Sequence, residues 1–198
     1  MNFHSPTTII VSGTTGSGKT TWLKRLLEEN LFDIPPKRIL YFYGAWQDIF
    51  DSFKNVEFYE GLPKSFDEFA DGGHNVLIFD DLQDDITKSK EAENLFTRGS
   101  HHKNLTVIFV NQNIFYQGKH SRTIALNTHY TILFRNPRAA LQLQTLASQT
   151  GLCHLKEAFQ DATKDKYGYL CIDLCPHSED MYRLRTRIFH DEDPVIYH

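Results

Sequence analysis

Short apolar runs alternate along the chain with segments in which apolar residues recur at helical spacing. The run 7–13 is rich in β-branched residues and ends at a glycine, as a buried strand does. In the stretch 18–30, four large apolar residues fall on one helical face instead. The pattern predicts strands at 7–13, 38–44, 75–81, 105–113, 130–135, 167–174 and 183–189, with helices at 18–30, 90–99, 137–149 and 155–163. We expect Gly99 to end the second helix and Pro137 to begin the third.

This order of elements predicts an α/β fold. Strands that alternate with helices form a mostly parallel sheet covered on both faces, so we expect a three-layer α/β fold. The last two strands lie too close in sequence for a helical crossover, which predicts an antiparallel hairpin at the C-terminus. We expect one domain over residues 1–198, with a core at 7–150 and a C-terminal extension at 151–198.

Composition narrows the class of protein. No apolar run is long enough to span a bilayer, and the first residues lack the pattern of a signal peptide, so no membrane association is expected. Three cysteines imply no disulfide framework and favour a reducing, intracellular location. The net charge of −4 conceals a segregation. Residues 94–156 contain no Asp or Glu and carry a formal +7, against −11 for the remainder, which permits a polyanionic partner.

The sequence "GTTGSGKT" at residues 13–20 fits the P-loop pattern at every fixed position. It lies between a predicted strand and a predicted helix, as a phosphate-binding loop must. Backbone N–H groups and the helix N-terminus would cradle phosphate oxygens, while Lys19 reaches the β- and γ-phosphates and Thr20 binds Mg²⁺. The residues expected to contact the nucleotide are Gly13, Thr14, Thr15, Gly16, Ser17, Gly18, Lys19, Thr20 and Thr21.

A second motif ends the strand "NVLIFDD". Two adjacent carboxylates at the end of a buried strand repel each other unless a cation intervenes, and the magnesium of a bound nucleotide is such a cation. We expect Asp80 to hold Mg²⁺ through its water shell and Asp81 to act as the general base toward water. Many P-loop ATPases carry Glu at the second position, so Asp81 has one methylene less reach. Asp84 and Asp85 are expected to be solvated turn or helix-capping residues.

Polar residues also end the strand "TVIFVNQN". If this strand lies between the P-loop strand and the strand ending at Asp80, its last amide lies beside the γ-phosphate. We expect Gln112 to be the sensor that positions water, with Asn111 as the second choice.

Two arginines compete for a role in phosphoryl transfer. Arg98 ends the helix before the sensor strand, where it could stabilise the γ-phosphate of a neighbouring subunit. Arg122 lies with Lys119 in what the sequence predicts to be a basic, glycine-containing loop, which could equally contact DNA phosphates.

Two other groups of residues receive structural interpretations. Cys171, Cys175 and His177 lack the second spaced pair of a zinc site, so no bound zinc is expected. Trp46 and Gln47 follow the second strand and could line a nucleotide or DNA edge, but an aromatic core is the favoured reading.

Together these motifs resemble a known family. The chain carries, in order, the P-loop, "YGAWQ", "LIFDDL" and the run "RGSHHKN…NQN…QGKHSR…LFRNPR". This order resembles the genome-packaging ATPases of double-stranded DNA viruses with double jelly-roll capsids, of the poxvirus, virophage and Polinton-like types. These ATPases belong to the FtsK–HerA superfamily. The resemblance covers residues 7 to about 150. It implies a three-layer P-loop NTPase fold of the additional-strand type, with ATP and Mg²⁺ as cofactors, in an ATPase that translocates DNA into a capsid. Its implied partners are double-stranded DNA, identical subunits in a pentameric or hexameric ring, and capsid vertex proteins. The implied location is the host cytoplasm or nucleus, or the virion. By position, Arg98 matches the trans-acting arginine and Gln112 the sensor.

Two other functions remain open from the sequence. A P-loop nucleotide or nucleoside kinase, or another small-molecule phosphotransferase, would need arginines in a lid and an acceptor pocket. The acid-free segment and the Gln112 position favour the motor. An AAA+ clamp or helicase loader is close to the motor reading, but no separate helical lid domain is evident.

Overall fold

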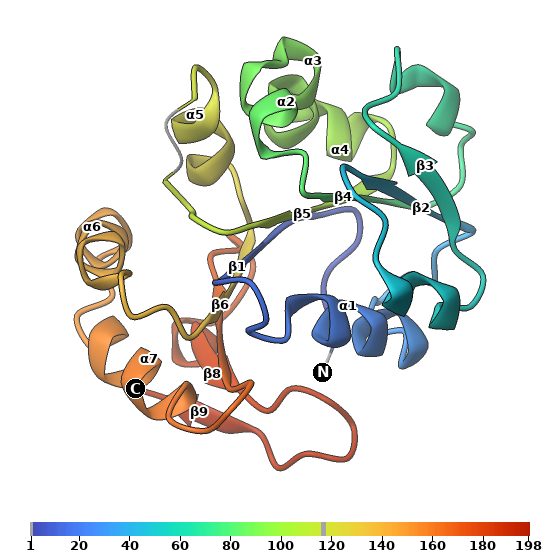
Figure 1. The fold of residues 1–198 in the computed structure, drawn as a ribbon. Coiled ribbons are helices and arrows are strands. Elements are labelled where there is room, and N and C mark those ends of the chain that lie inside the picture. Colours follow the sequence, from blue (N-terminus) through green and yellow to red (C-terminus); the bar gives the residue numbers. More distant parts are fainter. Residues whose placement is uncertain (1, 116–117) are drawn as a thin grey trace.

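The computed structural model describes residues 2–115 and 118–198 (Figure 1). In chain order its strands and α-helices are β1 (Thr8–Ser12), α1 (Lys19–Glu28), β2 (Arg38–Tyr43), β3 (Glu57–Glu60), β4 (Asn75–Asp80), α2 (Gln83–Lys88), α3 (Lys90–Asn94), α4 (Ser100–His102), β5 (Leu105–Asn111), α5 (Ser121–Leu126), β6 (Tyr130–Phe134), α6 (Ala140–Thr150), α7 (Leu155–Ala162), β7 (Tyr169–Asp173), β8 (Leu184–Thr186) and β9 (Val195–Tyr197). Short 3₁₀ helices occupy Asp48–Ser52, Asp67–Phe69 and Asp180–Tyr182, and a π-helix occupies Leu95–Gly99.

The strands of the described residues form one sheet in the order β3-β2-β4-β5-β1-β6-β7-β8-β9. The pairs from β3 to β6 are parallel, and those from β6 to β9 are antiparallel. This confirms the predicted α/β class and the antiparallel C-terminal hairpin. β5 lies between β1 and β4, so the additional-strand arrangement expected from the sequence is also confirmed.

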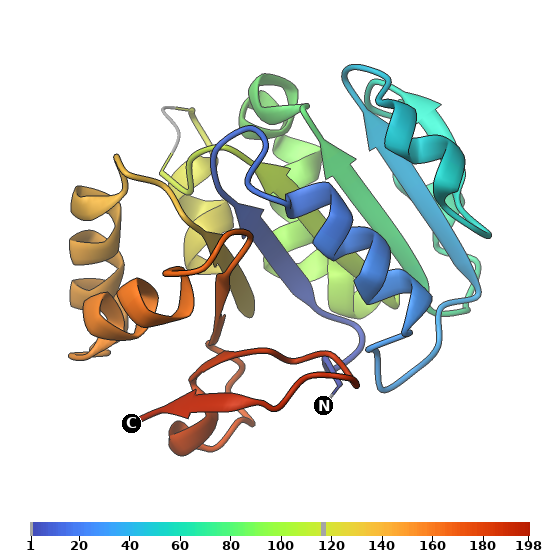
Figure 2. The same cartoon turned by 60° about the horizontal axis from the view of Figure 1, so that its bottom comes forward.

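Helices cover both faces of the parallel part of the sheet. Helix α1 lies on one face, and α2 to α5 lie on the other, as Figures 1 and 2 show. Alternate residues of the central strands therefore meet two different cores. On β5, Ile108 and Val110 belong to the cluster that contains the apolar face of α1, whereas Val107 and Phe109 belong to the cluster beneath α2 and α3. Burial on both faces explains why these strands read as continuous apolar runs.

The C-terminal part extends the sheet rather than forming a separate layer. Helices α6 and α7 pack on residues of β6, β7 and β8 in a third apolar cluster. Strand β9 then pairs with β8, which brings the last residues of the chain beside α7 (Figure 2).

Two predicted helix boundaries are wrong. Gly99 does not end a helix: its φ is −66°, and the helical path continues to His102 before Asn104, with φ +53°, turns the chain. Glycine permits a left-handed turn but does not force one. Pro137 does not begin α6, because the Asn136 side chain accepts a hydrogen bond from the Arg138 N–H and forms a turn first. The helix begins at Ala140.

The sequence patterns also missed four elements, β3, α2, α5 and β9. Each has six residues or fewer, so periodicity had too few positions to register. The consequence for the site concerns α5, because Arg122 lies in its first turn. The prediction of a loop at Arg122 is therefore wrong, whereas Lys119 does precede the helix, in a turn.

Candidate functional site

The loop between β1 and α1 wraps around the N-terminus of the helix. Gly18 is the N-cap residue of α1 and has φ +104°, a conformation that a residue with a Cβ rarely adopts. Helix α1 starts at Lys19, directly after this turn, so the N–H groups of its first turn face the loop. The arrangement is the strand, glycine-rich loop and helix predicted from residues 13–20, and it can hold a phosphate group.

The Lys19 side chain folds back over the loop. Its Nζ donates hydrogen bonds to the carbonyl oxygens of Gly13 at 2.7 Å and Thr14 at 3.0 Å. Burial lowers the pKa of Lys19 from its usual value, while the nearby charges of Asp80 and Asp81 act in the opposite direction. A phosphate chain in the loop would supply the anionic partner that the two carbonyl groups replace here.

Asp80 ends β4 as a buried carboxylate. Only 6% of the residue is exposed. Its Oδ2 accepts hydrogen bonds from the Tyr41 hydroxyl at 2.7 Å and the Gln47 amide Nε2 at 3.2 Å. Burial raises the pKa of Asp80, and the Tyr41 hydrogen bond and the charge of Lys19 oppose that rise. A buried carboxylate with a raised pKa is a position where a cation is electrostatically favoured.

Gln47 links the two predicted motifs. The Thr20 hydroxyl donates to Gln47 Oε1 at 3.4 Å, and the amide of the same side chain donates to Asp80. Sequence reasoning favoured an aromatic core for this segment. That reading fits Trp46, which packs edge-on against Tyr43 and Phe50 although it is half exposed, but it misses Gln47. The available signal was its place after the carboxyl end of β2, next to β4.

Asp81 leaves the strand in a left-handed conformation. Its φ is +57°, and its side chain is exposed. Gly44 makes this geometry possible, because a Cβ at Gly44 would lie 2.4 Å from the Asp81 carbonyl oxygen. The Gly44 N–H also donates to the carbonyl of Asp80 at 3.0 Å. The "YGAWQ" segment thus packs against the end of the strand that carries both aspartates.

The end of β5 presents two different amides. Asn111 is the last strand residue, is buried, and has no hydrogen-bond partner for its Oδ1 within the described structure. Gln112 lies beyond the strand and is exposed, and its backbone N–H donates to the Gln83 side chain at 3.4 Å. Gln112 as the sensor stays a prediction. Asn111, the second choice for the sensor, is buried at the end of β5.

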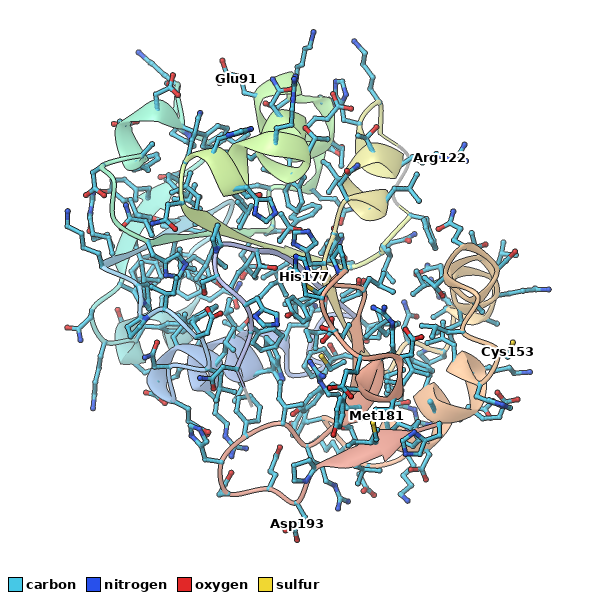
Figure 3. All side chains as sticks on the ribbon, turned by 180° about the vertical axis from the view of Figure 1, so that it is seen from behind. Glu91, Arg122, Cys153, His177, Met181 and Asp193 are labelled. Atoms are coloured by element: carbon cyan, nitrogen blue, oxygen red, sulfur yellow. The ribbon has the colours of Figure 1, made fainter. Side chains whose placement is uncertain are left out.

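The two arginines named from the sequence are exposed on helical segments. Arg98 lies in the π-helix that follows α3, whose Leu95 and Phe96 belong to the cluster beneath α2 and α3. Arg122 lies in α5 (Figure 3), and His120, just before this helix, forms a 2.8 Å ion pair with Glu93. Neither arginine lines the pocket beside the P-loop. Asp84 and Asp85 are both exposed in the first turn of α2.

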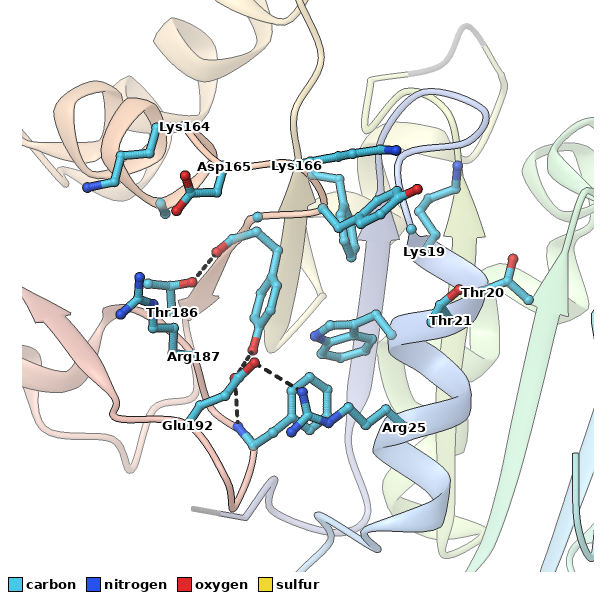
Figure 4. Close-up of a pocket in the computed structure, with 18 of the residues that line it drawn as sticks. Lys19, Thr20, Thr21, Arg25, Lys164, Asp165, Lys166, Thr186, Arg187 and Glu192 are labelled. Atoms are coloured by element: carbon cyan, nitrogen blue, oxygen red, sulfur yellow. Dashed lines mark hydrogen bonds and ion pairs between the residues drawn. The ribbon is translucent and has the colours of Figure 1, made fainter.

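A pocket of about 790 Å³ opens beside the P-loop (Figure 4). One wall is formed by residues of the loop and α1, including Gly18, Thr20 and Thr21. The opposite wall comes from the C-terminal segments 161–169 and 186–197. Sequence reasoning found no motif in these segments, and no spacing in them could have revealed their place, because only the sheet order brings them to the P-loop.

The oxygen groups of Thr20 and Asp80 suit a magnesium ion. Magnesium prefers hard oxygen ligands and keeps water or phosphate in most of its coordination positions. Among residues 2–115 and 118–198, no three His, Cys, Asp or Glu side chains gather as a self-sufficient metal site. One hydroxyl and one carboxylate, joined by Gln47, therefore fit an ion that arrives with a nucleotide. Cys171 and Cys175 are both buried and belong to no such group within the described part of the chain.

Within the described residues, no helix combines the length and apolar character needed to cross a bilayer. Solved structures with a similar fold include two viral packaging enzymes. The genome packaging NTPase B204 of Sulfolobus turreted icosahedral virus 2, in complex with ATP-gammaS, is 12% identical, with a TM-score of 0.56 and coverage of 97% of this chain and 96% of that one. The DNA-packaging ATPase B204 of Sulfolobus turreted icosahedral virus is 13% identical, with a TM-score of 0.57 and 97% of each chain covered.

At these identities the likeness concerns the fold, and at that level it confirms the resemblance to packaging ATPases given by the sequence motifs. No curated protein matches the chain. A family model described as "AAA domain" matches residues 5–123, which include the P-loop, Asp80 and the sensor strand. On that match, over more than half of its length, the chain belongs to the AAA domain family.

Proposed function

We propose that this protein hydrolyses ATP and uses the energy to move double-stranded DNA into a viral capsid. The most direct support is the sheet order, which brings the ends of β1, β4 and β5 to one edge. We infer from this order that Lys19, Asp80 and Asn111 belong to one site. Packaging NTPases with this fold have been solved with ATP-gammaS and with AMPPCP, which supports ATP as the substrate.

The chain's own residues divide the chemistry of hydrolysis among them. The P-loop N–H groups and Lys19 bind the phosphates and neutralise charge that develops on the γ-phosphate. Thr20 and Asp80 would hold Mg²⁺, which would supply positive charge to balance that of the phosphates. Asp81 accepts the proton of the attacking water. Its exposed side chain can reach into the site from the strand end, and Gln112 or Asn111 orients the same water.

The position of Arg98 supports a ring. Arg98 is exposed in the π-helix Leu95–Gly99 and does not line the pocket beside the P-loop of its own subunit, as expected of an arginine that serves a neighbour. We propose a homo-oligomeric ring, pentameric or hexameric, in which Arg98 acts in trans. Lys119 and Arg122 would contact DNA phosphates, and capsid vertex proteins would anchor the ring.

One experiment separates this motor from a small-molecule kinase. ATP hydrolysis is measured with and without linear duplex DNA, while the mass of the assembly is determined in the same buffer. We expect stimulation by DNA and a mass of several subunits. The motor would be refuted if the protein is a monomer, releases phosphate at the same rate with and without DNA, and transfers phosphate to nucleotides or nucleosides.

A further inference from the structure

The pocket beside the P-loop continues past the place where phosphates bind. With the triphosphate held by residues 13–20, the ribose and base would project toward the C-terminal wall. That wall offers aromatic and aliphatic surface from Tyr167, Val195 and Tyr197, with Phe134 below. A volume of about 790 Å³ lies within the range typical of small-molecule sites. The shape therefore indicates room for a complete nucleotide.

Tyr167 is held in an uncommon backbone conformation at the mouth of this pocket. Its φ is +68°, which is rare for a bulky residue, and 56% of it is exposed. The ring packs over the P-loop, because a Cβ at Gly18 would lie 3.1 Å from its Cδ1. The turn behind it is tight, since a Cβ at Gly168 would lie 2.4 Å from the carbonyl oxygen of Ala162. Strained residues that persist in this way concentrate at functional sites.

Most polar side chains of the C-terminal wall are already engaged with one another. Asp161 accepts hydrogen bonds from Lys164 at 3.0 Å and from the Tyr197 hydroxyl at 2.8 Å. The hydroxyl of Thr186 donates to a backbone carbonyl. These pairs engage most polar side chains of the wall, and Asp165 and Arg187 also line it without a side-chain hydrogen bond among the described residues.

Two other charged side chains that line the pocket, Arg25 and Lys166, also have partners. Arg25 is paired with Glu192 at 3.0 Å (Figure 4) and also contacts Asp191. Lys166 lies with its ammonium group 4.8 Å from the centre of the Tyr167 ring. This exposed lysine adds positive charge at the mouth, where phosphates enter, and a base that stacks on the ring can displace it.

We propose that Tyr167 is the surface on which the base of a nucleoside triphosphate stacks, and that the pocket accepts purine and pyrimidine triphosphates with little selectivity. Stacking tolerates any base because every base has a π-face. This inference rests on the proposed function, since it needs a triphosphate in the P-loop. It identifies the substrate class as nucleoside triphosphates in general.

The test compares nucleotides with inorganic tripolyphosphate, which fills the P-loop but has no base. Binding of Mg²⁺ complexes of ATP, GTP, CTP, UTP and tripolyphosphate is measured by calorimetry for wild-type protein, Tyr167→Phe and Tyr167→Ala. Tyr182→Ala is the matched control, because this exposed tyrosine lies outside the pocket. Both Tyr167 variants keep a Cβ, so they share the backbone strain of the wild type, and thermal melts verify that each is folded.

We expect Tyr167→Ala to weaken ATP binding about 5- to 150-fold, the range measured for removal of one stacked base. Tyr167→Phe and Tyr182→Ala should stay within about twofold of wild type, and tripolyphosphate binding should not change in any variant. The four triphosphates should bind wild-type protein within about 100-fold of one another, well below the discrimination of a site built on hydrogen bonds.

Three results would overturn the subsite alone. In the first, Tyr167→Ala loses the same affinity for ATP and for tripolyphosphate. In the second, it loses no affinity for ATP. In the third, wild-type protein prefers the triphosphate of one base by more than about 100-fold. Wild-type protein that binds neither ATP nor tripolyphosphate would instead overturn the proposed function, and the subsite with it.

Discussion

The hydrogen bond from Tyr41 to Asp80 offers a sharp test of how the site is held together. Tyr41 is completely buried, and its hydroxyl lies 2.7 Å from Oδ2 of the carboxylate. Tyr41→Phe removes this donor but keeps the ring, which packs against Phe50 at 4.8 Å and Phe58 at 5.2 Å between centroids. The substitution therefore isolates one hydrogen bond to a buried charged group.

The size of the effect follows from the nature of that bond. A hydrogen bond to a charged group contributes about 1.5–3 kcal/mol to the free energy of unfolding. For a domain of this length, each kcal/mol shifts the melting temperature by about 2–4 °C, so we expect Tyr41→Phe to melt about 3–12 °C lower. Tyr43→Phe is the matched control on the same strand, because the hydroxyl of Tyr43 has no hydrogen bond to the described side chains. It should melt within about 2 °C of wild type.

The loss of stability in Tyr41→Phe should decrease as the pH falls. Burial raises the pKa of Asp80 above its unfolded value, and the Tyr41 hydrogen bond opposes that rise, so the variant should have a still higher Asp80 pKa. The ionised carboxylate of Asp80 gains more from the Tyr41 hydrogen bond than the neutral acid does. The destabilisation is therefore fully present above the folded pKa of Asp80 and shrinks as the pH falls through it.

Thermal and urea melts of wild type, Tyr41→Phe and Tyr43→Phe from pH 4 to pH 8 would measure this dependence. Equal stability of Tyr41→Phe and wild type at pH 8 would show that the hydrogen bond contributes nothing. A loss of the same size at every pH would show that the ring, not the charge of Asp80, carries the effect.

The remaining predictions concern the proposed motor. Asp81→Asn should keep Mg·ATP binding and slow hydrolysis strongly, because an amide cannot accept the proton of water; equal loss of both would make Asp81 a metal-shell residue. Reversing the charge of Lys119 and Arg122 should lower the log–log salt slope of DNA binding by about 0.9 per lost phosphate contact, and an unchanged slope would remove them from the DNA path. Arg98→Ala should bind ATP normally and hydrolyse it about a thousandfold more slowly. Mixing it with Lys19→Ala protein should restore activity if Arg98 acts in trans, whereas co-assembled but inactive mixtures would point to Arg122.

The sequence predicted the parts of the fold that have a strong local signal. The apolar runs of the buried strands and the P-loop pattern identified the central sheet and the loop around Lys19, because burial on both faces and phosphate binding each constrain several consecutive residues. The end of β4 at Asp80 was predictable for the same reason.

The rest depends on contacts between distant segments. The sequence offered Gln47 as a possible nucleotide contact but favoured an aromatic core there, until β2 was placed beside β4. Tyr167 became a candidate only when the antiparallel extension was placed beside the P-loop. Short elements such as α5 carry too few residues for a periodic signal, which is why Arg122 was expected in a loop. Local patterns thus predicted the loop and strand end that we propose to bind phosphate and magnesium, and tertiary placement was needed for the rest of the candidate site.

In this structure, the groups expected to bind Mg·ATP form hydrogen bonds with other groups of the protein. Lys19 donates to two loop carbonyls, and the Gln47 amide spans Thr20 and Asp80. Each of these contacts must exchange for a contact with phosphate or metal, so the net gain on binding is the difference between two sets of hydrogen bonds and not the full value of either. For the proposed magnesium site, the two hydrogen bonds of Gln47 are part of that difference.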